Sequence, residues 1–496
     1  MFSKSLCLIG FGIILFLALT GTNVWAAAPN LKWSPAKQIP GYPSQTEPPY
    51  LVADRNKTVH AFHVQPVNDQ SAIVYSTWTL ARGWTMPVDI LLPPPSVNAF
   101  LLKGAFLDAK GTLHVIFLAG DATFGGDVYY SRASAVDAGH TSAWSPPRLV
   151  AEKSNMIAAA LTGDDNGNLF IFYSGTKAGN GLYEVYSRNG GDTWSDSLPV
   201  FLTNDRITYP GDITLLMDKG GLHLAWTVWR PPYGGEQLYY ARLDTERNRI
   251  TTPILLSRPS TGQLYLPNAP TMIVYNDTLF LIYSEVTDLA SGSMAKVMRQ
   301  STDLGKTWTK PVWAFPPLIG GNGAAPLLVD SNNGLHAILA NRAGDCCHGM
   351  WYSAWEGERW SEPQAIINPG PKTPLFDPQI PQAVISQGNV ILATWINEEK
   401  YNGVWYSYAK LDIPELPATP LPTPLVTPSP SLPSVPPAPT NTPISTVQSP
   451  PRSPVTNNTT ETPTLVELSP NLSILIGAVP VLALIVLISL WQGRRQ

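Results

Sequence analysis

Charged residues are few in this sequence. Asp, Glu, Lys and Arg make up 14% of the 496 residues, and the formal net charge is −4. Domains that bind nucleic acid usually present a strongly basic surface, so this composition argues against a nucleic-acid partner.

Cysteine is also scarce, which excludes a fold held together by disulfides. The chain has 3 cysteines, and Cys7 falls in an N-terminal segment with the features of a leader. The adjacent Cys346 and Cys347 cannot join distant segments, so a hydrophobic core must stabilise the fold. This pair can form a vicinal disulfide, remain as free thiols, or bind a metal with His348. The single nearby imidazole disfavours a metal site, and no motif predicts a cofactor.

Glycine, proline and aromatic residues are abundant. The chain has 38 Gly and 49 Pro, and aromatic residues reach 10%. This composition is typical of many short strands joined by turns, and it disfavours long exposed helices. We therefore expect an all-β fold.

Both ends of the chain have the patterns of export and anchoring. Residues 1–27 contain Lys4, an apolar run and small residues at 26–28, as in a secretory signal peptide. Residues 472–491 are almost wholly apolar, and Arg494 and Arg495 follow in the short tail 492–496. This pattern predicts a transmembrane helix with a cytoplasmic C-terminus. We expect a single-pass protein of the cell membrane with its middle region outside the cell.

Residues 413–470 are rich in Pro, Thr and Ser. Such a composition cannot build a packed core and favours extended, disordered chain. We expect a stalk that holds the preceding region away from the membrane.

Residues 31–412 contain a pattern that returns seven times, about every 55 residues, as in a repeat architecture. In each unit an apolar segment ends at a turn and a second apolar segment follows. Seven equivalent positions of this second segment lie 53 to 57 residues apart: His60, His114, Phe170, His223, Phe280, His336 and Ile391. The last unit lacks a fourth strand, which residues 33–39 can supply beside residues 404–410. The sequence thus predicts a seven-bladed β-propeller closed by its N-terminal strand, an arrangement that leaves no open edge.

Two turns of the repeat share a motif of small polar residues, glycine and tryptophan. The short polar side chains can bond backbone amides, and glycine accepts the left-handed conformation. The two copies are Ser187, Asn189, Gly191 and Trp194, and Ser301, Asp303, Gly305 and Trp308. This pattern resembles the Asp-box (BNR) repeat of the sialidase-like β-propeller superfamily, and the resemblance implies a propeller.

Histidines and tryptophans that recur with the blade period are expected to pack rather than react. Four histidines share one strand position that Phe or Ile fills in the other blades, so we predict structural roles for them and no metal site. The repeated tryptophans are expected to lie between blades.

The loops between the second and third strands, and those leading to the next blade, differ from unit to unit. Variable loops on a repeating scaffold commonly carry function. Aromatic faces stack on sugar rings, and guanidinium groups bind carboxylates. Each such residue can equally be an ordinary loop anchor or solvated charge. The candidate ligand-binding residues are Trp229, Arg230, Tyr233, Glu236, Arg258, Tyr265, Glu285, Arg342 and Tyr401.

The resemblance to sialidases also implies a possible activity. Members of that family hold the substrate carboxylate with three arginines, and they use a tyrosine nucleophile, a glutamate and an aspartate. The family's first arginine lies in a motif whose counterpart here, residues 36–40, has no arginine. We therefore assign no catalytic residue and leave the enzyme question open.

Three hypotheses remain. The first is a membrane-anchored extracellular recognition module that binds a glycan or a protein at its loops. The second is a cell-surface exo-sialidase-type glycoside hydrolase, and the third is a scaffold for another exported protein. The sequence does not determine the oligomeric state.

Overall fold

The computed structural model describes residues 31–42, 47–67, 70–94, 98–121, 125–152, 158–219, 221–230, 234–258, 268–288, 293–320, 323–344, 346–373, 375–397 and 403–421. All of them belong to one compact unit, Met1–Val426. The predicted signal peptide and transmembrane helix, and the stalk beyond residue 421, lie outside the described residues. Within the described part the one helix is a 3₁₀ turn, η1 (Thr141–Ala143). None of its helices is long and apolar enough for a membrane span.

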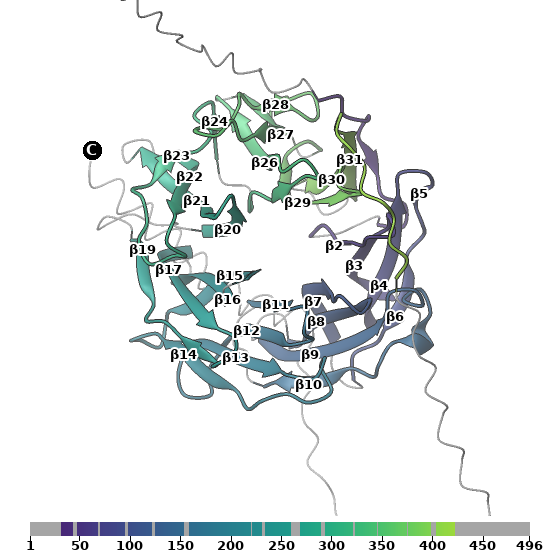
Figure 1. Ribbon diagram of the computed structural model, residues 1–496, viewed down its shortest axis with the longest axis vertical. Helices are drawn as coiled ribbons and strands as arrows, with labels where there is room; N and C mark the ends of the chain where they lie inside the picture. Colours follow the sequence, from purple (N-terminus) through teal and green to yellow (C-terminus); the bar gives the residue numbers. More distant parts are fainter. Residues whose placement is uncertain are drawn as a thin grey trace, which may run out of the picture. The chain divides into compact units, whose positions relative to one another are not determined.

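The chain forms seven antiparallel sheets arranged around a centre, so the predicted seven-bladed propeller is confirmed (Figure 1). Buried apolar clusters join each blade to the next. One cluster contains Phe62 of the first blade and Phe117 of the second, and another contains Leu392 of the seventh blade and Trp78 of the first. The core is therefore distributed between the blades, and the ring closes on itself.

The first four blades follow one another in chain order. The first contains β2 (Tyr50–Ala53), β3 (Val59–Val67), β4 (Gln70–Thr79), β5 (Gly83–Trp84) and β6 (Val88–Leu91). The second contains β7 (Asn98–Leu107), β8 (Thr112–Asp121), β9 (Gly125–Ser134) and β10 (Arg148–Ala151). The third contains β11 (Ala159–Gly163), β12 (Leu169–Gly175), β13 (Gly181–Ser187) and β14 (Leu198–Leu202). The fourth contains β15 (Tyr209–Asp218), β16 (Gly221–Arg230), β17 (Gly234–Asp244), β18 (Arg249–Ile250) and β19 (Ile254–Ser257).

The remaining three blades complete the ring. The fifth contains β20 (Asn268–Tyr275), β21 (Thr278–Asp288), β22 (Ser293–Ser301) and β23 (Val312–Trp313). The sixth contains β24 (Leu318–Ile319), β25 (Leu327–Val329), β26 (Leu335–Ala343), β27 (Cys347–Ala354) and β28 (Gln364–Ala365). The seventh contains β29 (Pro378–Ser386), β30 (Val390–Asn397), β31 (Val404–Lys410) and the N-terminal strand β1 (Lys37–Gln38).

The N-terminal segment closes the seventh blade as the sequence predicts. In β1, Lys37 and Gln38 pair with Tyr406 and Trp405 of β31. Trp33 adds a bridge to Ala409, and the Ile39 amide donates to the Val404 carbonyl at 2.8 Å. The outer edge of the last blade is therefore covered by residues from the opposite end of the domain.

A recurring Asp–His–Tyr arrangement explains the repeated histidines. In the second blade, Asp108 Oδ1 accepts the amides of Lys110 and Thr112 at 2.9 and 2.7 Å, which fixes the turn between β7 and β8. Asp108 Oδ2 lies 3.3 Å from His114 Nε2, and His114 Nδ1 lies 2.7 Å from the Tyr130 hydroxyl. The same arrangement occurs at His60 and His336, and at His223 with a longer carboxylate distance. These histidines are buried, and they support the blades.

The two motif turns receive the tyrosine of the preceding blade. Ser301 Oγ accepts the Gly305 amide at 2.8 Å, and Asp303 Oδ1 accepts the Thr307 amide at 2.9 Å. The Tyr240 hydroxyl of the fourth blade donates to the Leu304 carbonyl at 3.2 Å. The built position of a Cβ on Gly305 lies 2.0 Å from that hydroxyl, so only glycine fits. The copy at residues 187–194 receives Tyr130 in the same way, and Trp194 and Trp308 meet these tyrosines edge-on at 5.0 Å.

The packed chain continues beyond β31 and beyond residue 412, where the composition predicts the stalk to begin. The last described residues run from β31 toward the first blade (Figure 1). The Leu416 amide donates to the Gln387 carbonyl, and the Thr419 amide donates to the Arg55 carbonyl, both at 2.8 Å. Glu415 forms an ion pair with Lys57. Residues 411–421 therefore form a strap across turns of the seventh and first blades.

Candidate functional site

The ring has two faces of different construction. The turns from the first to the second strand of each blade, and from the third to the fourth, form what we call the turn face. The connections from the second to the third strand, and from the fourth strand to the next blade, form the loop face. The structure describes six of the nine candidate residues, and all six belong to loop-face segments. Tyr233, Tyr265 and Tyr401 lie outside the described residues.

The first strands of three blades are irregular where they reach the loop face. Asp212, Ala269 and Ile380 have φ angles of 35°, 49° and 51°, although none is glycine. Each lies at a register shift, between β15 and β16, β20 and β21, or β29 and β30. Such backbone conformations cost free energy, and they concentrate at functional sites.

Asp212 joins the fourth and fifth blades at this irregularity. Its Oδ2 accepts the Ala269 amide at 3.0 Å, the Trp229 Nε1–H at 3.2 Å and the Thr227 hydroxyl at 3.3 Å. Burial raises the pKa of Asp212, and these hydrogen bonds and Lys103 partly offset the effect. Trp229 Nε1 also lies 2.7 Å from Thr227 Oγ1, and its ring packs on Gly211. Trp229, a candidate ligand-binding residue, is thus held in one orientation by Asp212, which the sequence analysis did not single out.

Arg230 and Glu236 are brought together, but they bind each other. Arg230 Nε forms an ion pair with Glu236, and Nη2 lies 3.2 Å from Asp205 Oδ2. The hydrogen bond that Arg230 donates to Glu236 is the main cause of its raised pKa. Two carboxylates already neutralise this guanidinium, so Arg230 is poorly suited to hold a substrate carboxylate.

Arg258 and Glu285 lie at the junction of the fourth and fifth blades. With the Gln237 amide oxygen turned toward it, Arg258 donates from Nη2 at 2.9 Å. Glu285 Oε1 accepts the Ser257 hydroxyl at 2.6 Å. The first contact connects β17 with the segment after β19, and the second connects β19 with β21.

Lys296 is a further charged residue in this region, and it is 2% exposed. Its Nζ donates to Ser284 Oγ at 2.6 Å and to the Gly323 carbonyl of the sixth blade. Burial lowers the pKa of Lys296 to about 7, although Asp212 opposes the shift. No pattern in the sequence marks Lys296 as a site residue, because a lysine near a strand end is usually solvated.

Arg342 lies on the sixth blade, beside a histidine–aspartate pair. Arg342 on β26 is directly opposite His348 on β27. His348 Nδ1 lies 2.6 Å from Asp377 Oδ1, and Lys372 and Gln379 contact Asp377 Oδ2 at 3.1 and 3.0 Å. Burial would raise the pKa of Asp377, but these partners hold it below its usual range.

Cys346 and Cys347 form a disulfide at the tip of the same hairpin. His348 could be singled out in the sequence because it follows these cysteines. Asp377 could not, because it is 29 positions away and in the next blade. Among the described residues no three His, Cys, Asp or Glu side chains are grouped as metal ligands.

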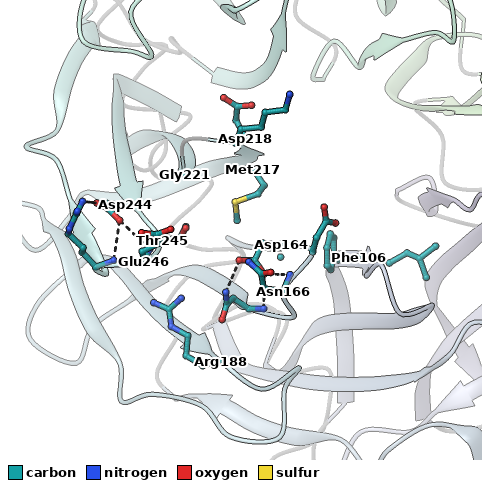
Figure 2. A pocket seen from close by; sticks show the side chains of 16 residues that line it. Phe106, Asp164, Asn166, Arg188, Met217, Asp218, Gly221, Asp244, Thr245 and Glu246 are labelled. Atoms are coloured by element: carbon teal, nitrogen blue, oxygen red, sulfur yellow. Dashed lines mark hydrogen bonds and ion pairs between the residues drawn. The ribbon is translucent and has the colours of Figure 1, made fainter. Parts of the chain in front are cut away.

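The turn face also has a hollow, of about 760 Å3, between turns of the third and fourth blades (Figure 2). Two of its carboxylates, those of Asp164 and Asp244, are already used by the turns. Asp164 Oδ1 accepts the amides of Asn166 and Asn168 at 3.0 and 2.8 Å, and Asp244 accepts amides and the guanidinium of Arg247. Arg188 lies over the Tyr186 ring at 4.9 Å. This hollow is a by-product of turn construction.

Comparisons with known proteins show which solved structures this fold resembles. No family model and no curated protein matches the chain. A solved ulvan lyase, from a polysaccharide lyase family, aligns over 75% of this chain and 95% of its own, with 10% identity and a TM-score of 0.50. An ulvan lyase bound to a saccharide of GlcA and Rha3S has the same coverage and identity, with a TM-score of 0.49. A Hadza microbial sialidase aligns over 74% of this chain and 65% of its own, with 13% identity and a TM-score of 0.42. The chain shares the propeller fold of the first lyase.

Proposed function

We propose that this protein is a glycan-binding propeller of the cell surface, and that its loop face across the fourth to seventh blades binds the ligand. One observation carries the proposal: polar side chains that are almost fully buried lie at the loop ends of these blades, and the fourth blade adds the partly exposed indole of Trp229 there. They include Lys296, Asn341, Asp377 and Asn397, each at most 5% exposed. Ligand sites typically combine aromatic surface with a few fixed polar groups.

Two features support a glycan rather than an apolar protein partner. Trp229 offers a ring whose orientation is fixed by Asp212 and Thr227, and such rings stack on the apolar faces of sugars. The neighbouring groups are hydroxyls, amides and carboxylates, which suit sugar hydroxyls. A sialidase-type hydrolase is not favoured, because Arg230 is neutralised by Glu236 and Asp205.

The proposal includes export, a stalk and a single membrane span. The apolar and small residues of 1–27, the Pro, Thr and Ser of 413–470 and the apolar run 472–491 support it. Protease added to intact cells is expected to release a soluble propeller by cutting between residues 422 and 467. Complete protection of the chain would contradict this topology. We also propose that the turns at residues 187–194 and 301–308 are Asp-box repeats.

Binding of the full-length protein to an array of oligosaccharides tests the proposed function. Trp229→Leu is expected to abolish or strongly weaken the strongest signals, because loss of a stacked aromatic typically costs about 1 to 3 kcal/mol. Trp313→Leu is the matched control, since Trp313 is exposed on the outer strand β23 of the fifth blade. The proposal fails if no oligosaccharide binds, or if the two variants bind alike.

A further inference from the structure

The arginines of the loop face differ in what their guanidinium groups contact. Arg230 is paired with two carboxylates, and Arg258 faces the Gln237 amide. Arg342 is half-buried and, among the described residues, its guanidinium has no hydrogen bond or ion pair. A guanidinium without a carboxylate partner is suited to an incoming anion.

The side chains of Arg342 and His348 project to the same face of the sixth blade. Directly opposite residues on antiparallel strands share a face, and Arg342 pairs with His348 in the ladder between β26 and β27. Ala340 and Met350, the next pair on the same side of these two strands, pack in the cluster between the sixth and seventh blades. Arg342 and His348 therefore lie at the loop end of that interface.

His348 is held more firmly than a surface histidine. Asp377 is 1% exposed and contacts His348 Nδ1, while its other oxygen contacts Lys372 and Gln379. The backbone of His348 exchanges two hydrogen bonds with Gly370, at 2.8 and 3.0 Å. Because Nδ1 faces Asp377, Nε2 is directed away from this carboxylate. The disulfide between Cys346 and Cys347 also ties the hairpin tip beside His348.

From this juxtaposition we infer that Arg342 and His348 form a subsite for the acidic group of a sugar residue, either a carboxylate or a sulfate ester. Asp377 is a positioning residue that orients His348. The inference rests on the proposed glycan-binding role of the loop face, and it names the ligand class as acidic glycans. A planar guanidinium binds either oxyanion through two parallel hydrogen bonds, so the two acidic groups share one chemistry.

Three probes of similar length test the inference with immobilised full-length protein: oligogalacturonate, sulfated dextran fragments and uncharged dextran fragments. We expect one or both charged probes to bind more tightly than uncharged dextran. Arg342→Gln should weaken that binding by roughly tenfold or more, and Arg342→Lys should restore only part of it, because an ammonium lacks the paired donors. Comparison of the two charged probes identifies the acidic group.

Arg230→Gln is the matched control, because it removes a loop-face guanidinium that is already neutralised. Asp377→Asn tests positioning: it should weaken binding of the charged probes and leave the uncharged probe unaffected, whereas a purely structural role would alter all probes together with the melting temperature. The inference is overturned if neither charged probe binds, or if Arg342→Gln binds them like the unaltered protein. Binding of uncharged dextran that requires Trp229 would keep the proposed function while rejecting the acidic subsite.

Discussion

The turn face and the loop face use the same residue types for different purposes. On the turn face, the carboxylates of Asp54, Asp108 and Asp330 accept two backbone amides each and then contact a histidine of the same blade. On the loop face, Asp212 and Asp377 contact side chains and amides from two blades. Repetition of the first arrangement indicates that it builds the fold. Among the described residues the second arrangement does not recur from blade to blade, as expected where a scaffold carries a site.

The largest effect on stability should follow from opening the ring, which depends on repeated structure and not on the loop face. Deleting residues 31–40 removes β1 and the Trp33 bridge, which exposes the edge of β31. We expect a sharp fall in melting temperature, since the whole outer edge of the seventh blade loses its partner. Thermal unfolding of proteins that start at Leu31 and at Gly41 measures this. Equal melting temperatures would show that the N-terminal strand does not close the ring.

A glycine substitution on the turn face should have the next largest effect. Gly305 has a φ of +84°, and an added Cβ would lie 2.0 Å from the Tyr240 hydroxyl. Gly305→Ala is therefore expected to cost about 2 to 5 kcal/mol, from backbone strain and overlap together. Gly83→Ala is the control, because Gly83 has a φ of +71° with no atom near the added methyl. Similar losses for both variants in urea unfolding would mean that Tyr240 does not require this glycine.

Most of the fold could be predicted because its pattern repeats. The loop-face contacts could not be predicted, because they do not repeat. The seven strand positions from His60 to Ile391 and the closing strand follow from local patterns that recur with one period. The loop-face partners do not recur. Asp377 meets His348, and Asp212 meets the Ala269 amide, only because neighbouring blades are placed side by side. The sequence pointed to Trp229 and Arg342 by residue type, but it did not reveal that Arg230 is neutralised while Arg342 is unpaired.

Glu184 is a buried carboxyl that belongs to neither arrangement. It binds no turn amide or histidine, and it contacts no polar group of a neighbouring blade among the described residues. It is 3% exposed on β13, its Oε1 has no hydrogen bond among the described residues, and burial raises its pKa to about 7 although Arg188 opposes the shift. A carboxyl with a raised folded pKa stabilises the fold at low pH, and this contribution is lost as pH rises from about 4.5 to about 7.

Glu184→Met tests that loss, since Met298 and Met350 fill the equivalent positions of the fifth and sixth blades. The variant should be more stable than the unaltered protein at pH 8, by at most about 3 kcal/mol, and the difference should shrink toward pH 5. Unfolding in urea at both pH values gives the comparison. A difference that is the same at both pH values would show that ionisation of Glu184 is not its cause.

The smallest effect on stability is expected at Arg230. Its side chain is 30% exposed, and those of Glu236 and Asp205 are 33% and 40% exposed, so solvent screens both ion pairs. Such surface pairs typically contribute less than about 1 kcal/mol, and the strand pairing of β16 with β17 does not depend on them. Arg230→Ala should therefore leave the melting temperature nearly unchanged. It should also change oligosaccharide binding much less than Trp229→Leu, because Glu236 and Asp205 already occupy the guanidinium. A loss of binding equal to that of Trp229→Leu would show that the ligand displaces these carboxylates, and it would move the arginine of the site from the sixth blade to the fourth.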